Sequence, residues 1–207
     1  MTAVPHPEAE PATASAPRRA IGDTVARRAT GETVALLGAI GPPKGSATLL
    51  AIARRARLSY PGFQFRVIGH TDIDPLLREV GNVRITGAYE PRELAGLLDR
   101  SEARIALFLH NWPETYSYTL GEAVAHGLYP LVPDLGAPAQ RVREAGWGAV
   151  FGFPIEVNEV LAAISTALAR PVDEQDGVGP TRFAHADAAA KHRALMGVGE
   201  QAPTRVA

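Results

Sequence analysis

The chain has 207 residues, 46% of them hydrophobic and 21% charged, and a formal net charge of −1 at pH 7. This composition is that of a soluble globular domain with an ordinary core, and it excludes a general electrostatic attraction for nucleic acid or for an acidic membrane surface. The lack of cysteine excludes disulfides, thiol nucleophiles and cysteine metal sites, and it fits a cytoplasmic protein. No run of about 18 apolar residues occurs, so no membrane span is expected.

The two ends of the chain differ from its middle in composition. Residues 1–30 are rich in Pro, Ala and Glu and lack the apolar segment of a signal peptide, which predicts a disordered tail. Residues 171–207 are expected to form a linker, a weakly anchored helix over 183–196 and a disordered end. The ordered domain is therefore predicted over residues 31–170.

Within this domain, short apolar runs alternate with helical patterns. The first run, over 33–39, is a predicted strand that ends at a Gly-Pro turn, and a helix over 46–57 follows with Ser46 as its N-cap. The later elements follow in chain order: a strand at 63–69, a loop with a short helix, a strand at 82–87, a helix at 91–100, a strand at 104–110, a helix from 115–117 to about 126, a strand at 129–134, a helix from about 139, a short strand within 148–153, and an amphipathic helix at 154–170.

This alternation predicts an α/β fold, a Rossmann-like parallel sheet with helices on both faces. Such sheets bind ligands in the crevice beyond the carboxyl ends of their strands. Residues that directly follow the strands are therefore the candidates for a functional site.

The loop after the first strand carries Gly38, Gly41, Lys44 and Gly45. Glycines allow backbone N–H groups to approach an anion, and the start of the next helix carries partial positive charge, to which Lys44 adds its own. The loop could thus cradle a phosphate, or it could be a tight turn with an exposed lysine. Neither GxxxxGK[ST] nor GxGxxG follows the strand, which argues against a P-loop or dinucleotide-binding enzyme.

The segment WPETYSYTLGEA, residues 112–123, follows the strand expected at 104–110. It places Glu114 on a loop at the sheet edge, and the free N–H groups of residues 115–118 at the start of a helix. Glu122 lies further along that helix, where a carboxylate packed against the sheet needs a hydrogen-bonding partner such as a ribose diol. In the alternative interpretation, Glu114 only caps the helix and Glu122 pairs with a surface arginine.

A third loop, residues 134–138, contains Gly136 and offers further N–H donors at the same edge. His110, at the end of the buried strand, is the one histidine expected to face the cleft. Three loops suited to phosphate or sugar at one edge favour a ligand site over three unrelated turns. The sequence has no obvious metal-binding cluster.

Four stretches together resemble a known family. Residues 113–123 resemble the E-x7-E signature of retaining GT-B glycosyltransferases of the GT4 type (glycosyl transferases group 1), and GAIGPPKGSATLL resembles the family's GRLxxxKGxxxLL turn. NVRITGAYEPRELAGLL resembles its V-x-x-x-G-x-x-x-x-x-E-L segment, and DLGAPAQRV its glycine loop near the sugar diphosphate. The likeness covers about residues 33–170 in family order, which corresponds to the C-terminal, donor-binding half of a GT-B fold.

The resemblance implies a hexosyltransferase-like enzyme of polysaccharide biosynthesis that transfers sugar from a nucleoside diphosphate sugar to a glycan or glycoconjugate acceptor. The donor is a substrate, and the resemblance implies no cofactor and no metal. Glu114 would be catalytic and would stabilise charge near the transferred sugar, Lys44 would meet the pyrophosphate, and Glu122 would bind the ribose. The donor-binding residues that it implies are Gly41, Lys44, Gly45, Thr115, Tyr116, Ser117, Glu122 and Gly136.

The chain departs from the family pattern in two residues and in length. Ala39 stands where an arginine is usual, and Gln140 where a glutamate is common. A GT-B enzyme has a second, acceptor-binding half, which would precede residue 33, so the resemblance implies a separate N-terminal half as partner. The alternative is a non-catalytic nucleotide-sugar-binding or interaction module, either a truncated remnant or one half of a split enzyme.

Overall fold

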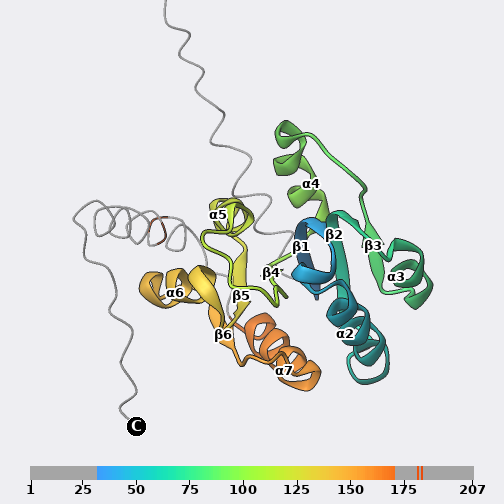
Figure 1. Ribbon diagram of the computed structural model, residues 1–207. Coiled ribbons are helices and arrows are strands. Elements are labelled where there is room, and N and C mark those ends of the chain that lie inside the picture. The colour runs from blue at the N-terminus through green and yellow to red at the C-terminus, as the bar shows by residue number, and fades with distance from the viewer. Residues whose placement is uncertain (1–31, 171–180, 182, 184–207) are drawn as a thin grey trace, which may run out of the picture.

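The computed structural model describes residues 32–170 together with residues 181 and 183. These residues form one six-stranded parallel sheet in the order β3-β2-β1-β4-β5-β6 (Figure 1). The predicted tail over 1–30, the linker and, except for Phe183, the helix over 183–196 lie outside the described residues. The strands are β1 (Thr33–Ile40), β2 (Gln64–Thr71), β3 (Val83–Ile85), β4 (Ile105–Leu107), β5 (Tyr129–Pro133) and β6 (Ala149–Phe151).

Helices cover both faces of the sheet, as predicted (Figure 1). Helix α2 packs against α3 and α7 on one face, and right-handed connections place α4, α5 and α6 on the other. The helical elements are η1 (Pro42–Lys44), α2 (Ser46–Ser59), α3 (Asp74–Val80), η2 (Pro91–Glu93), α4 (Leu94–Ser101), α5 (Tyr118–Ala125), α6 (Gly136–Ala145) and α7 (Val157–Leu168). The α/β, Rossmann-like fold is thereby confirmed, and no helix among the described residues is long and apolar enough to cross a membrane.

The central strands β1 and β4 are buried on both faces. Their runs VALL and IAL have no alternation because α2 and α7 cover one side while α4 and α5 cover the other. Strand β4 ends at Leu107, three residues before the predicted end at His110. Beyond Leu107 the chain no longer pairs with β1: Phe108 N–H donates to the Leu131 carbonyl, and Asn111 N–H donates to the Pro43 carbonyl.

Helices α4 to α7 begin at residues other than those predicted, and α5 begins at Tyr118, directly after the predicted range 115–117. The helix predicted from residue 91 starts as the 3-10 turn η2, closed by a reciprocal capping box of Glu90 and Glu93, before α4 continues it. Helix α7 begins at Val157, after Pro154, rather than at that proline. Helix α6 begins at Gly136 instead of near residue 139, because Pro138 is accommodated in a first turn that needs no N–H donor.

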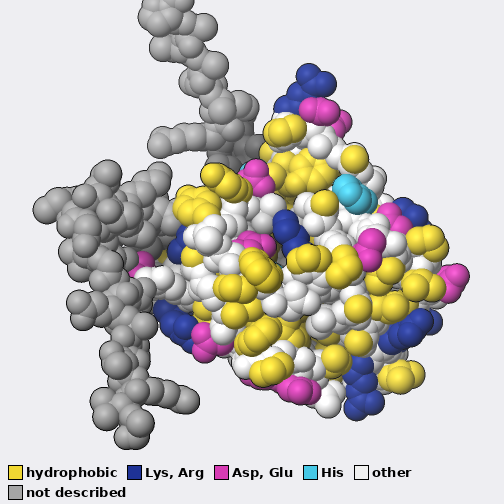
Figure 2. Space-filling model, in the orientation of Figure 1, with side chains coloured by type: hydrophobic (Ala, Val, Ile, Leu, Met, Phe, Trp, Pro, Cys, Tyr) yellow, Lys and Arg dark blue, Asp and Glu magenta, His cyan; other side chains and the backbone are white. Residues whose placement is uncertain are grey.

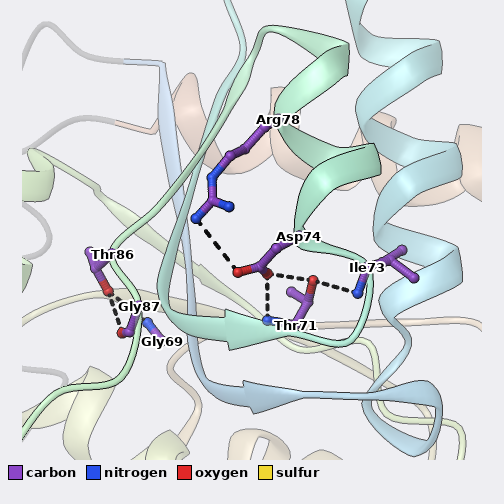
Figure 3. A network of polar contacts seen from close by, with 7 residues as sticks. All are labelled: Gly69, Thr71, Ile73, Asp74, Arg78, Thr86 and Gly87. Carbon is purple, nitrogen blue, oxygen red and sulfur yellow. Dashed lines mark hydrogen bonds and ion pairs between the residues drawn. The ribbon is translucent and has the colours of Figure 1, made fainter.

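The turn between β2 and α3 is closed by side chains rather than by backbone bonds alone (Figure 3). Asp74 Oδ1 accepts hydrogen bonds from the N–H and the hydroxyl of Thr71, both at 2.7 Å, and Thr71 Oγ1 accepts from Ile73 N–H at 3.1 Å. Arg78, one turn along α3, lies 3.6 Å from Asp74 Oδ2. The Asp74 carboxylate therefore fixes the position of α3 relative to the end of β2.

Replacement of Asp74 by alanine is expected to lower the free energy of unfolding by about 1–2 kcal/mol, because Thr71 N–H and Thr71 Oγ1 lose their shared acceptor. The neighbouring Asp72 is exposed, so Asp72→Ala should change stability by no more than about 0.5 kcal/mol. Urea denaturation of both variants measures the difference. If both substitutions lowered the free energy of unfolding equally, the hydrogen bonds of Asp74 would contribute no more to stability than an exposed carboxylate does.

Candidate functional site

An open hollow lies at the carboxyl ends of β1 and β4, the two strands between which the sheet order reverses. This is where doubly wound sheets bind their ligands. The hollow is shallow, with a cavity volume of about 20 Å³. Its apolar wall is built by side chains of β1, β4 and the residues after β4, and its polar groups are Lys44, His110, Glu114 and Thr119. Lys44 and Glu114, which are far apart in sequence, thus line the same hollow.

The Gly41–Gly45 loop enters this hollow from β1. Lys44 N–H donates to the Gly41 carbonyl at 2.9 Å, which closes the 3-10 turn, and Gly45 takes a left-handed conformation with φ +79°. A Cβ on Gly45 would overlap the Leu109 carbonyl oxygen and lie 2.7 Å from Leu109 Cβ. The glycine therefore allows the loop to lie directly against the segment that leaves β4.

Asn111 joins the same two loops. Its N–H donates to the Pro43 carbonyl at 2.9 Å, and its Nδ2 donates to the Pro42 carbonyl at 3.1 Å. No sequence motif predicts a role for Asn111, although its position shortly after β4 is the kind of position where site residues are expected. These bonds hold the Lys44 turn in a fixed place beside the segment that carries Glu114.

The segment before α5 carries the predicted N–H donors. Among the described residues, no hydrogen bond involves the N–H groups of residues 115–118, so these groups are available to a ligand at the positive end of the helix. Ser117 occupies the N-cap position but makes no side-chain cap bond, and its backbone is left-handed, with φ +64°. A non-glycine residue in this conformation is strained and must be held by its surroundings.

The loop over residues 134–138 packs against the segment that carries Glu114. His110 is 2% exposed, and its Nε2 lies 3.1 Å from the Leu135 carbonyl oxygen, which can only accept, so Nε2 carries the proton. The Glu114 carbonyl accepts from Ala137 N–H at 2.9 Å. A Cβ on Gly136 would lie 2.8 Å from the Glu114 carbonyl oxygen, so the glycine permits this close approach. Gly136 thus positions the backbone of Glu114.

Glu122 lies outside the residues that line the hollow, further along α5. Because Thr119 and Glu122 are three residues apart on one helix, they project from neighbouring positions of the same face. The half-buried Glu122 acts on Tyr89, in the loop after β3: burial raises the pKa of the Tyr89 hydroxyl, and the negative charge of Glu122 raises that pKa further. No sequence motif predicts this effect of Glu122 on Tyr89.

The coupling between Glu122 and Tyr89 can be tested by titration. Glu122→Gln is expected to lower the pKa of Tyr89 while leaving it above the ordinary tyrosine value of about 10, because burial, the larger cause, remains. Glu114→Gln should leave the Tyr89 titration unchanged. The titration is followed through the ring carbon signals of 13C-labelled tyrosine. An unchanged Tyr89 titration in Glu122→Gln would contradict the proximity of the two side chains.

The charges around the site are mixed. On the face shown in Figure 2, basic and acidic side chains are interspersed. Within the part of the chain that the structure describes, no group of three or more His, Asp or Glu side chains could hold a metal ion. Among the described residues that line the hollow, Lys44 supplies the Lys or Arg side chain, and the N-terminal end of α5 adds partial positive charge.

Neither a family model nor a curated protein matches the sequence. Solved structures do share its fold. Sucrose-phosphate synthase from Thermosynechococcus elongatus is 19% identical, with a TM-score of 0.62 over 86% of this chain and 49% of that one. Anabaena HepE, solved in complex with UDP, is 17% identical, with a TM-score of 0.57 over 83% and 48% of the respective chains. WaaG, a glycosyltransferase involved in lipopolysaccharide biosynthesis, is 17% identical, with a TM-score of 0.54 over 85% and 48%.

At identities of 17–19%, the likeness to these structures shows the fold alone. This chain spans about half the length of each of these three structures. A Rossmann-like parallel sheet, shared with part of each of these three structures, is therefore established for the described residues.

Proposed function

We propose that this chain binds a nucleotide sugar as the C-terminal, donor-binding half of a retaining, GT4-type glycosyltransferase. The observation that carries the proposal is that Lys44 and Glu114 line one hollow, directly beside the unbonded N–H groups that precede α5. A cation, a set of N–H donors and a carboxylate in one place suit a ligand with a diphosphate and a sugar.

The diphosphate would lie between Lys44 and the N–H groups of residues 115–117. These donors are held in place before the reaction, so they would stabilise the negative charge that grows on the departing diphosphate without reorganisation. This arrangement supplies the electrostatic role without a metal ion. Glu114, beside Lys44 in the hollow, would stabilise the charge that develops near the transferred sugar and is the proposed catalytic residue.

The nucleoside would extend along α5 toward Glu122. A carboxylate accepts hydrogen bonds from both hydroxyls of a ribose, and such charge-assisted bonds are stronger than neutral ones. Tyr89, whose hydroxyl is affected by the charge of Glu122, would border the same end of the ligand. The UDP bound to the Anabaena neighbour supports a nucleoside diphosphate as the ligand class.

The acceptor, a glycan or glycoconjugate, would be bound by a separate N-terminal half. The support for this partner is that the chain spans about half the length of each of the three structures named above. A second candidate is a non-catalytic module that binds nucleotide sugar. The exposed Ala39 near the end of β1, in place of the arginine that the resemblance implies, favours this candidate because it leaves Lys44 as the side-chain cation of the hollow.

The test combines binding and turnover. UDP, GDP, ADP and their glucose conjugates are titrated calorimetrically into the full chain, and transfer to glycan acceptors is assayed with and without a candidate N-terminal half. We expect binding by the chain alone, and turnover with retained anomeric configuration only on mixing. Binding without turnover in every mixture would favour the non-catalytic module, and a chain that binds none of these compounds would overturn the proposal.

A further inference from the structure

A buried arginine lies behind the site, on α6. Arg141 is 5% exposed and falls on the buried side of α6, together with Pro138, Val142 and Ala145. Burying an arginine costs free energy unless its N–H donors are hydrogen-bonded. The groups that accept these bonds therefore indicate its structural role. The sequence signal was present: Arg141 interrupts an otherwise apolar helix stripe.

Arg141 holds the segment that leads into α5. Its Nη1 donates to the Tyr116 carbonyl at 2.7 Å and to the Ser117 carbonyl at 3.1 Å. Its guanidinium carbon lies 4.5 Å from the centre of the Tyr116 ring and 5.9 Å from the centre of the buried Phe183 ring. The cation thus bonds two consecutive carbonyls while packing against the ring of the first of these residues.

The direction of two carbonyls determines the direction of two N–H groups. In a trans peptide the C=O and the following N–H point to opposite sides. With the Tyr116 and Ser117 carbonyls bonded to Arg141, the N–H groups of Ser117 and Tyr118 are directed away from α6. Arg141 is not among the described residues that line the hollow, whereas Glu114 and Thr119, on either side of this segment, are.

The left-handed backbone of Ser117 explains why the segment needs such support. For a residue with a Cβ, this conformation costs roughly 1–2 kcal/mol relative to the right-handed one. In this geometry the Ser117 carbonyl bonds to Arg141, where a regular helix start would direct it to the N–H of residue 121. Without the guanidinium, relaxation of Ser117 would rotate the adjoining peptide planes.

We propose that Arg141 is a positioning residue for phosphate binding: by holding the Tyr116 and Ser117 carbonyls, it presents the Ser117 and Tyr118 N–H groups to the diphosphate of the nucleotide. This inference rests on the proposed function. It assigns Arg141 no contact with the ligand, and its effect is transmitted through the backbone.

The binding experiment compares Arg141→Met and Arg141→Lys in the full chain, with the pairs UDP and uridine, ADP and adenosine, and GDP and guanosine as probes. Both variants are expected to weaken binding of the diphosphate by about tenfold or more, the effect of misplacing one or two hydrogen bonds to a charged group. Binding of the nucleoside alone, followed by NMR titration, should not change. Lysine keeps the charge but cannot reproduce the planar fork, so it should not restore affinity.

The matched control is Arg143→Met, which removes the same charge from the same helix. Arg143 is exposed, and its Nη2 lies 2.6 Å from Asp134 Oδ2. This variant should bind the diphosphate within about twofold of the wild type, an effect of the size expected at exposed charged positions. Wild-type affinity in Arg141→Lys would indicate through-space attraction and would overturn the proposal, as would an equal loss of nucleoside and diphosphate binding.

A measurement without ligand separates this inference from the proposed function. Amide hydrogen exchange of the free variants should show faster exchange or altered signals at residues 115–118, with the Gly41–Gly45 loop unaffected. If the Arg141 variants do not fold, Phe183→Leu, which loosens the packing around the guanidinium, should produce a smaller change at the same amides. Unchanged amides overturn the positioning role. A wild-type chain that binds no nucleotide overturns the proposed function, and the amides still decide whether Arg141 holds the segment.

Discussion

Replacing Gly45 with alanine is expected to destabilise the protein by about 3 kcal/mol or more, from left-handed backbone strain of roughly 1–2 kcal/mol and overpacking of about 1–3 kcal/mol. The added Cβ would overlap the Leu109 carbonyl oxygen and come within 2.7 Å of Leu109 Cβ. The contact is with backbone next to the central strand β4, so it cannot be relieved by rotation of a side chain. Urea denaturation and thermal unfolding measure the loss.

Gly87 offers a matched control for Gly45. It has a similar positive φ of +86°, but a Cβ added there would have no atom within 4 Å. Gly87→Ala should therefore show the backbone strain alone, about 1 kcal/mol. The difference between the two variants isolates the close approach of the Lys44 turn to β4, and similar losses at both positions would contradict that approach.

Replacing Glu122 with alanine is expected to weaken binding of a nucleoside diphosphate about a hundredfold, which for a weak ligand abolishes detectable binding. In the proposed function this carboxylate accepts both ribose hydroxyls, and each charge-assisted bond contributes about 1.5–3 kcal/mol, where about 1.4 kcal/mol corresponds to a factor of ten. The side chain is half-buried on α5, so its removal should have little effect on folding. Calorimetry with UDP, ADP and GDP provides the measurement.

Two further variants define the role of Glu122. Glu122→Gln keeps the shape and one acceptor oxygen and should retain intermediate affinity, whereas Glu79→Ala removes a similar charge from an exposed position on α3 and should leave binding unchanged. A 2′-deoxyribose nucleotide removes one of the two hydroxyls and should bind the wild type more weakly but the alanine variant equally. Unchanged affinity in Glu122→Ala would remove Glu122 from the site.

The sequence predicts the site residues that directly follow strands better than it predicts the residues around them. Lys44, His110 and Glu114 are predicted site residues because they follow strands, and the structure places all three in one hollow. The same rule applied after β3 would have included Tyr89. Glu122 is predicted from the E-x7-E spacing and from its position in a helix that packs against the sheet. It does not line the hollow, because it lies further along α5 than Thr119, and its charge acts on Tyr89.

Local chemistry by itself determined the elements. Apolar runs such as those of β1 and β4 could only be strands covered on both faces, and the helical spacing between them required helices to provide that cover. These patterns depend on neighbours in sequence, so they determined the α/β class and placed the candidate residues at the ends of strands.

Only the tertiary structure decided how those ends meet. The strand order, the early divergence of β4 from β1, and the contact of Gly45 with Leu109 all depend on packing between distant segments. The same holds for Arg141, whose role follows from two carbonyls on another element. A sequence pattern reports the periodicity of one segment, but which donor meets which acceptor depends on how the sheet brings separate loops together.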